Sequence, residues 1–201
     1  MATVRREEIL AAFERCVARY GIEASLEQIA DEAGIRRSLI RHYIGNREEL
    51  VNSLIERITQ DYPAHVAAAF LHTDGAHEVQ AILDYLFRVE LDDNTSDAII
   101  VHVMMTAKER YPQAKNSLLH MFAMFISHLA DALARAYPQA PLSQCQQIAY
   151  AIFCLAQTNE SMLWVGFDQS HNQSARQSAE LLLRSLASAG TQEEQLSYDR
   201  S

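Results

Sequence analysis

Apolar residues recur along this chain every three or four positions and almost nowhere in strict alternation. That spacing places them on one face of a helix, whereas a half-buried strand needs a period of two. Glycine and proline, which interrupt helices, number only 6 and 4 among 201 residues. The pattern therefore predicts an all-α protein built from amphipathic helices with short connections.

The first fifty residues predict three helices in close succession. The first covers residues 4–20 and ends at Gly21. Ser25 begins the second, because Gln28 completes a capping box with it, and Gly34 supplies a tight turn before the third. We expect the third helix to be anchored on the first by Leu39, Ile40, Tyr43 and Ile44. Two short helices joined by a tight turn indicate a helix-turn-helix.

The remainder of the chain predicts a larger helical domain. Asn46 and Glu49 form another cap pair and begin a fourth helix, which Pro63 is expected to break or kink near Tyr62. Later helices are expected at residues 63–72, 76–91, 96–110, 113–136, 143–166 and 172–189. We therefore expect a helix-turn-helix domain at residues 1–46, a helical effector-binding and dimerisation domain at 47–190, and a flexible tail at 191–201.

The third predicted helix is basic although the chain carries a net charge of −9. Residues 1–50 hold eight arginines against nine acids, residues 51–201 hold nine basic residues against seventeen acids, and no acid lies between Gly34 and Arg47. An acidic chain binds DNA weakly without sequence preference, but site-specific binding is not excluded. A helix-turn-helix with arginines on its second helix is suited to the DNA major groove.

Several polar residues of this segment are therefore predicted to contact DNA. Arg37 and Arg41 lie four positions apart on one side of a helix, where each can bind guanine edges or phosphates. The alternative is an ordinary solvated helix face, and for Tyr43 the alternative is burial. The predicted DNA-contacting residues are Ser25, Gln28, Arg36, Arg37, Ser38, Arg41, His42, Tyr43 and Arg47.

Motifs in the first fifty residues resemble those of the TetR family of transcriptional regulators. The matching residues are Arg5-Arg6, Ile9 to Phe13, Gly21, Ile29-Ala30, Ala33 to Ile35 and Glu48 to Leu50. The segment from Ser38 to Ile44 is most similar to the betaine-pathway (BetI-like) branch, which favours a His-Tyr pair there. Arg41 departs from the family pattern and adds a donor to the reading face.

The resemblance implies a homodimer that binds a near-palindromic double-stranded DNA operator and is controlled by a small-molecule inducer. It places the dimer interface on the last two helices, where close packing is favoured by small residues; the alternative is that their apolar residues form only the core of one chain. The predicted interface residues are Ile148, Ile152, Leu155, Met162, Ala175, Ala179, Leu182, Leu183 and Leu186.

The inducer site is expected among aromatic, methionine and histidine residues of the larger domain. Most such residues form core, but several can line an apolar cavity with a few polar groups. Trp164 offers a cation–π face if the ligand is a quaternary amine. The candidate ligand-binding residues are Tyr62, His65, Tyr85, His102, Met105, His120, Phe125 and Trp164.

Other classes of function find less support in the residues. Cys16, Cys145 and Cys154 form no metal-ligand pattern and are expected to be buried, so we expect no metal and no cofactor. The sequence contains no nucleophile–base motif and no phosphate-binding glycine loop that would indicate an enzyme. Without a signal peptide or a membrane-spanning run, we expect a cytoplasmic protein. The sequence thus predicts a DNA-binding regulator, most simply a repressor released by a small ligand; the alternatives are a ligand-binding helical protein without DNA activity and, less favoured, a small helical enzyme.

Overall fold

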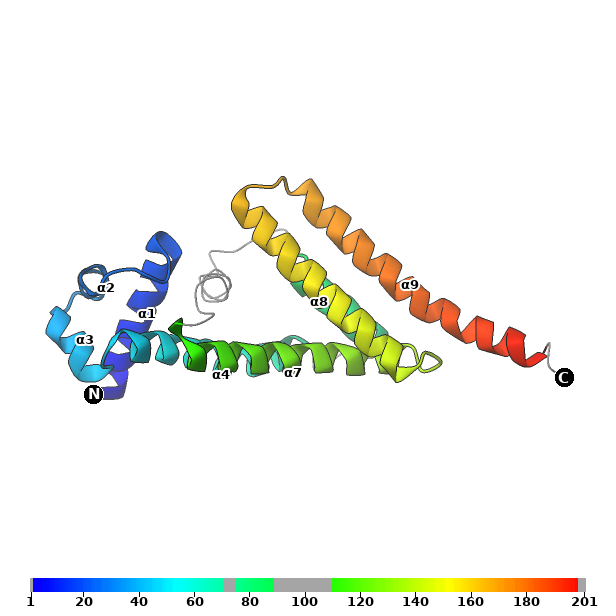
Figure 1. Cartoon of the computed structure of the whole chain (residues 1–201), viewed down its shortest axis with the longest axis horizontal. Coiled ribbons are helices and arrows are strands. Elements are labelled where there is room, and N and C mark those ends of the chain that lie inside the picture. The colour runs from blue at the N-terminus through cyan, green and yellow to red at the C-terminus, as the bar shows by residue number, and fades with distance from the viewer. Residues whose placement is uncertain (1, 71–74, 89–109, 199–201) are drawn as a thin grey trace. The chain divides into compact units, whose positions relative to one another are not determined.

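The computed structural model describes residues 2–70, 75–88 and 110–198, with side chains left undescribed at 2–3, 61–70, 164 and 188–198. These residues form α-helices and no strand, which confirms the all-α prediction (Figure 1). The helices are α1 (Ala2–Tyr20), α2 (Leu26–Ala33), α3 (Arg37–Tyr43), α4 (Arg47–Phe70), α5 (Gly75–Leu86), α7 (Pro112–Ala136), α8 (Leu142–Val165) and α9 (Ser170–Tyr198). The helix expected at 96–110 falls almost wholly outside the described residues.

The chain divides into two compact units. The N-terminal unit comprises the described parts of residues 1–65 and 92–121, and the C-terminal unit comprises those of 66–91 and 122–201. The N-terminal unit thus contains α1, α2, α3, most of α4 and the first turns of α7. Its core forms where Phe13 and Val17 of α1, Ile40 of α3 and Leu54 of α4 are completely buried.

Local capping positions these helices as the sequence predicts. The Ser25 hydroxyl accepts a hydrogen bond from the Gln28 backbone N–H at 3.2 Å, and the Gln28 side chain accepts one from the Ser25 N–H at 2.7 Å. Gly34 ends α2 in the left-handed region at φ 64°. Asn46 and Glu49 form the same reciprocal pair at the start of α4, at 2.6 and 3.0 Å. The helix-turn-helix is therefore confirmed in its local geometry.

Three boundaries differ from the sequence prediction. Pro63 does not break the helix, because α4 continues from Arg47 to Phe70, whereas the alternative of a kink at Pro63 stays a prediction. A single proline removes one helical hydrogen bond, and the helix formers on both sides outweigh that loss. Helix α5 ends at Leu86 rather than near residue 91, and α9 continues past residue 190 to Tyr198 where an irregular tail was expected.

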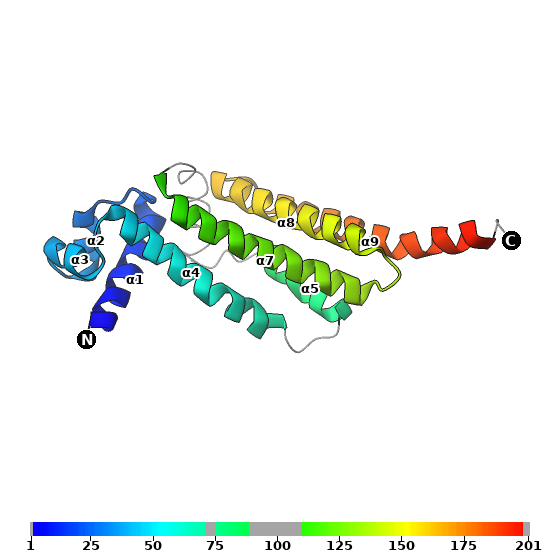
Figure 2. The same ribbon diagram turned by 60° about the horizontal axis from the view of Figure 1, so that its bottom comes forward.

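The C-terminal unit is a helical bundle in which α8 and α9 lie side by side and run in opposite directions (Figures 1 and 2). Leu133 of α7, Ile152 of α8 and Leu186 of α9 are completely buried in its core. Asn172 is also buried, and its side-chain amide donates to the Phe87 carbonyl at 2.8 Å. This bond ties the first turn of α9 to the end of α5.

A buried carboxylate connects α5 to α7 within the C-terminal unit. Glu78 is only 6% exposed, and its oxygens lie 2.5 Å from Arg135 and 3.2 Å from His128. A buried carboxylate needs such partners to offset its lost hydration.

Helix α7 is long and apolar enough, by length and composition alone, to cross a membrane. Its apolar residues Leu118, Phe125 and Leu133 are instead buried within the protein.

Candidate nucleic-acid interface

Helix α3 is held to the N-terminal unit by one side and presents the other to solvent. Ile40 is completely buried, whereas Arg36, Arg37, Ser38, Arg41 and His42 are exposed. Leu39, expected as an anchor, is 36% exposed, and Tyr43 and Ile44 are only half-buried. The anchoring prediction is therefore fully met by Ile40 alone, because a helix of two turns directs only one of its apolar residues at the core.

The three arginines of this segment differ in their partners. Arg37 donates from Nη1 to Oε1 of Glu27, on α2, at 2.7 Å. Neither Arg36 nor Arg41 has a hydrogen-bond or ion-pair partner among the residues that the structure describes, and both are exposed. Their guanidinium donors are thus available to an outside acceptor such as a phosphate or a guanine edge.

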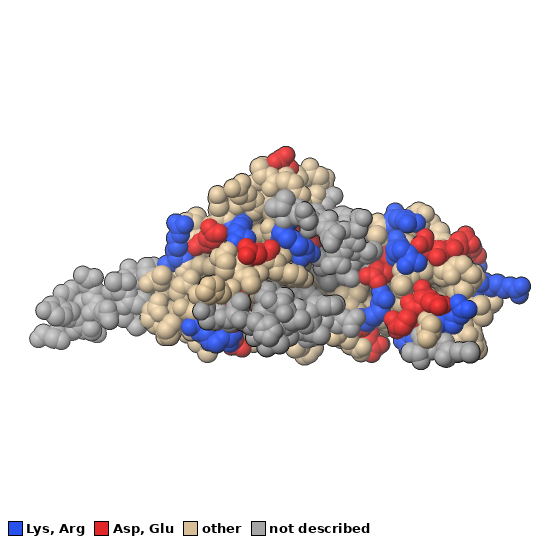
Figure 3. Space-filling model, turned by 180° about the vertical axis from the view of Figure 1, so that it is seen from behind, with Lys and Arg blue, Asp and Glu red and all other residues tan. Residues whose placement is uncertain are grey.

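Two arginines on α1, Arg15 and Arg19, differ from Arg36 and Arg41 because they share an acidic partner. Glu32 of α2 lies 2.6 Å from Arg15 and 3.0 Å from Arg19. The hydrogen bond from Arg15, with the charge of Arg19, lowers the pKa of Glu32 below its usual value. On the face seen in Figure 3 the charges of this unit are mixed, with acids beside bases. Arg36 and Arg41 differ from Arg15 and Arg19 because neither has an acidic partner among the described residues.

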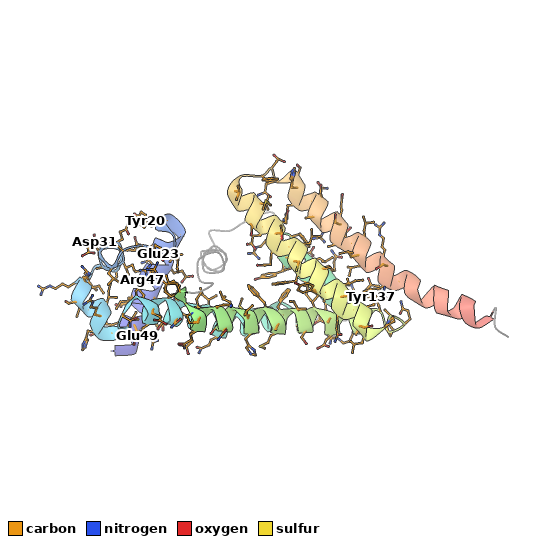
Figure 4. The ribbon with its side chains drawn as sticks, in the orientation of Figure 1. Tyr20, Glu23, Asp31, Arg47, Glu49 and Tyr137 are labelled. Carbon is orange, nitrogen blue, oxygen red and sulfur yellow. The ribbon has the colours of Figure 1, made fainter. Side chains whose placement is uncertain are left out.

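Arg47 has a structural position that the sequence did not reveal. Its guanidinium donates to the carbonyls of Ile22 and Ala24 and lies 4.9 Å from the centre of the Phe13 ring. Figure 4 shows it at the start of α4, in the part of the unit that also holds Glu23. Two of its donors are used inside the protein, where they hold the loop between α1 and α2, and a phosphate contact of Arg47 stays a prediction.

Ser25 and Gln28 also serve the fold through their capping box, but each keeps a donor. The Ser25 hydroxyl accepts within the box and can still donate its proton, and the Gln28 carboxamide uses its oxygen and keeps its NH₂ group. On α3, the rings of His42 and Tyr43 meet edge to face, with 4.9 Å between their centroids. Contacts of these four residues with DNA stay predictions.

The comparisons with known proteins agree with this geometry. No family model matches the chain. It is 23% identical over 155 residues, 76% of its length and 74% of the relative's, to the HTH-type transcriptional regulator BetI of Agrobacterium fabrum. The match to BetI of Brucella suis is 28% identical but spans only 39% of this chain and 40% of that protein.

Solved structures show the same fold over almost the whole length. A TetR-family regulator from Agrobacterium tumefaciens matches with a TM-score of 0.78 at 16% identity, covering 92% of this chain and 98% of that one. The chain is thus similar in sequence to BetI regulators and similar in fold to TetR-family regulators. A regulator from Saccharomonospora viridis, solved in complex with choline, matches with a TM-score of 0.80 at 13% identity, covering 90% and 96% of the two chains.

The candidate ligand-binding residues are only partly placed by the structure. His102 and Met105 lie outside the described residues, as do the side chains of Tyr62, His65 and Trp164. Phe125 is buried in the C-terminal unit, where its ring lies 5.9 Å from that of Phe153, and Phe153 lies 5.1 Å from Phe122. Of these three rings, the sequence prediction named only Phe125 as a candidate ligand-binding residue.

Two other ligand candidates have surroundings that the sequence did not show. Tyr85 carries the Arg88 guanidinium over its ring at 4.8 Å. His120 was expected to line a cavity, but it is exposed in the N-terminal unit. The buried apolar residues of this part of α7 are Leu118, Met121 and Phe125, and a ligand contact of His120 stays a prediction.

The predicted dimer-interface residues are mostly buried within the single chain. The six with at most 8% exposure are Ile148, Ile152, Ala175, Ala179, Leu183 and Leu186. These six are buried within the single chain, and their place in a dimer interface stays a prediction. Leu155 and Leu182 are half-buried, and Met162 is 39% exposed. A helical repeat marks an apolar face but cannot say which chain covers it.

Outward-facing apolar residues on the same helices were missed by the sequence analysis. Tyr150 is 60% exposed, Val165 76% and Leu181 61%. Cys154 is half-buried one turn after Tyr150, and a hydrogen bond between the two side chains raises the pKa of Tyr150. Each lies within a short apolar run, such as residues 148–153 around Tyr150, and such a run does not show which of its residues faces outward.

The remaining cysteines are inert in character. Cys16 and Cys145 are buried, and loss of hydration raises the pKa of each thiol. Burial thus keeps both thiols protonated, and a protonated thiol is a poor nucleophile and a poor metal ligand. Within the described ranges, no group of three or more histidine, cysteine or acidic side chains is arranged to hold a metal ion.

Proposed function

We propose that this protein is a TetR-family repressor that binds a near-palindromic operator through α3 and is released by a small ligand. The observation that carries the proposal is the exposed face of α3, where Arg36 and Arg41 have no partner among the described residues. A guanidinium group left unpaired on a helix that follows a tight turn is placed to meet phosphate or guanine. The fold supplies the rigid support for that helix.

The proposal includes a homodimer formed through α8 and α9. Its support is the exposure of Tyr150, Val165 and Leu181 on these two helices in the single chain. Two subunits related by a twofold axis would present two copies of α3 to half-sites about 34–36 Å apart. One arginine-bearing helix of two turns holds too few contacts for tight binding, so pairing supplies the affinity.

For the ligand we propose a small organic cation. The structural neighbour from Saccharomonospora viridis was solved with choline, and the C-terminal unit of this chain contains the aromatic cluster of Phe122, Phe125 and Phe153. Aromatic faces attract quaternary ammonium groups through their ring quadrupoles. Such a ligand would release DNA by favouring a conformer in which the two copies of α3 no longer match the half-sites.

Selection of bound sequences from a random DNA pool tests the DNA part of the proposal. The wild-type protein should return a near-palindromic motif, and Arg41→Ala should weaken binding to it by about 1–3 kcal/mol. Lys115→Ala on α7 is the control, since it also removes one exposed positive charge. Absence of any selected motif would favour a ligand-binding protein without DNA activity.

A separate titration tests the ligand part. Choline added to the protein–operator complex should give a calorimetric signal and release the operator, whereas sodium chloride at equal ionic strength controls for screening. No heat and no release would remove the organic cation from the proposal. That outcome would leave the DNA-binding function untouched, because the two experiments measure different equilibria.

A further inference from the structure

We infer that Glu27 is a specificity-determining residue of the DNA-binding face: it positions Arg37 so that the two side chains together select a guanine–cytosine base pair. This inference rests on the proposed function, because it assumes that α3 enters the major groove. It goes further by identifying one acidic residue, outside α3, as part of the reading surface. Neither residue alone would produce the same selectivity.

The geometry leaves the binding edge of Arg37 free. Only Nη1 of Arg37 donates to Glu27, at 2.7 Å. A guanidinium has five N–H donors in a planar fork, so the edge formed by Nε and Nη2 retains two parallel donors. Two parallel donors match O6 and N7 of guanine. Glu27 thus holds the arginine from one edge while the other edge stays available.

The ion pair between Arg37 and Glu27 is not needed for the stability of the fold. Its side chains are 51% and 64% exposed, and pairs that exposed contribute little to folding. The Ser25–Gln28 capping box, the left-handed Gly34 and the buried Ile40 already hold α2 against α3. What the pair does add is orientation, since a long exposed arginine otherwise samples many rotamers.

An acid beside a DNA-binding helix lowers affinity for phosphate, and that loss is explained if it produces selectivity. Cytosine presents an N4 amino donor that a carboxylate accepts, whereas thymine presents the O4 acceptor, which a carboxylate repels. Arg37 and Glu27 together therefore match guanine and its paired cytosine and disfavour an A·T pair. Repulsion of the wrong partner is a common source of specificity.

Arg36 and Arg41 provide the contrast within the same segment. Neither has an acidic partner among the described residues, so neither guanidinium is oriented before DNA arrives. The ordering entropy of each is then lost on binding, which favours contacts that tolerate several positions. Of the arginines near α3, Arg37 is the one whose reading direction is set in advance.

The test compares wild type, Glu27→Gln, Arg37→Ala and the double variant by selection from random DNA, followed by titration of the selected operator and its single-position variants. Glu27→Gln keeps the capping box intact, and thermal unfolding checks that each variant folds. The matched control is Glu8→Gln, which removes the acid of another exposed pair, 2.7 Å from Arg5 on α1.

Glu27→Gln should bind the operator as tightly as wild type or more tightly, because a negative charge is gone, yet lose about tenfold in discrimination at one G·C position. Arg37→Ala should lose preference at that same position, and the double variant should lose no more than Arg37→Ala. Glu8→Gln should leave the preference at every position unchanged.

Two results would overturn the inference while leaving the proposed function standing. One is a Glu27→Gln protein whose affinity changes equally for all sequences with every base preference retained. The other is loss of a preference in Arg37→Ala that Glu27→Gln keeps. A wild-type protein that selects no motif would instead refute the proposed function, and this inference with it.

Discussion

Replacement of Arg47 by alanine provides a direct test of how the N-terminal unit is held together. The guanidinium of Arg47 crosses from the start of α4 to the loop after α1, where it donates to the Ala24 carbonyl at 2.6 Å and to the Ile22 carbonyl. It also lies 4.9 Å from the centre of the Phe13 ring. Alanine removes all of these contacts without touching the exposed face of α3.

The magnitude follows from these contacts. Each hydrogen bond from a charged donor contributes about 1.5–3 kcal/mol, and the ring contact adds about 1 kcal/mol. The Nε atom of Arg47 is buried without a partner among the described residues, and its removal relieves a penalty of about 1–3 kcal/mol. The net expectation is that Arg47→Ala lowers the free energy of unfolding by about 3 kcal/mol.

Urea unfolding followed by circular dichroism measures this loss. Arg47→Lys should recover about half of it, because an ammonium reaches one carbonyl and cannot fork across both. Arg36→Ala is the control, since this exposed arginine has no partner among the described residues, and its stability should stay within about 0.5 kcal/mol of wild type.

The salt dependence of operator binding separates a structural role from a phosphate contact. At a temperature where both variants are folded, Arg36→Ala should reduce the salt slope by about 1, and Arg47→Ala should leave it unchanged. Unchanged stability of Arg47→Ala together with a reduced salt slope would refute this reasoning. Arg47 would then belong with the DNA contacts after all.

Three further variants test other parts of the fold. Gly34→Ala should destabilise the protein by about 1–2 kcal/mol through backbone strain alone, since φ is +64° and an added Cβ meets nothing within 4 Å; a denaturation midpoint equal to wild type would contradict this. Glu32 has a folded pKa below its usual 4.5, so the stabilisation it brings is present above that pH and is lost as pH falls through the lower folded value. The melting temperatures of wild type and Glu32→Gln should therefore differ most near pH 7, begin to approach each other as pH falls below about 4.5, and converge below the folded pKa of Glu32; a difference constant with pH would show that ionisation of Glu32 does not contribute. Asn172→Ala should lower the unfolding free energy by about 2 kcal/mol, because the Phe87 carbonyl and the Asn159 amide both lose their partner; a change under about 0.5 kcal/mol in urea unfolding would count against it.

Local rules were sufficient wherever a residue acts on its neighbours in the chain. The Ser25–Gln28 capping box, the Asn46–Glu49 pair and the left-handed Gly34 were all predicted from spacing and are all present. Each depends on backbone groups within three or four positions, so no distant contact is needed to decide it. Pro63 is the exception, since the helix on both sides overrides its local preference.

Contacts between distant segments required the tertiary structure. Arg47 looked like one more cation near α3, but its partners at Ile22 and Ala24 lie 25 and 23 residues away. The pairing of Arg37 with Glu27 likewise depends on how α3 turns back against α2. The charge pattern of a sequence shows how many basic side chains a segment carries, whereas tertiary packing determines which acceptor each of those side chains meets.

The order of polar and apolar residues determined by itself that the chain is helical, where most helices begin, and that a basic helix follows a tight turn. Only the tertiary structure decided which apolar residues of α8 and α9 are buried, such as Ile152 and Leu186, and which face outward, such as Tyr150 and Leu181. The physical reason is that helical periodicity identifies an apolar face from one segment alone, while burial depends on the second segment that covers it.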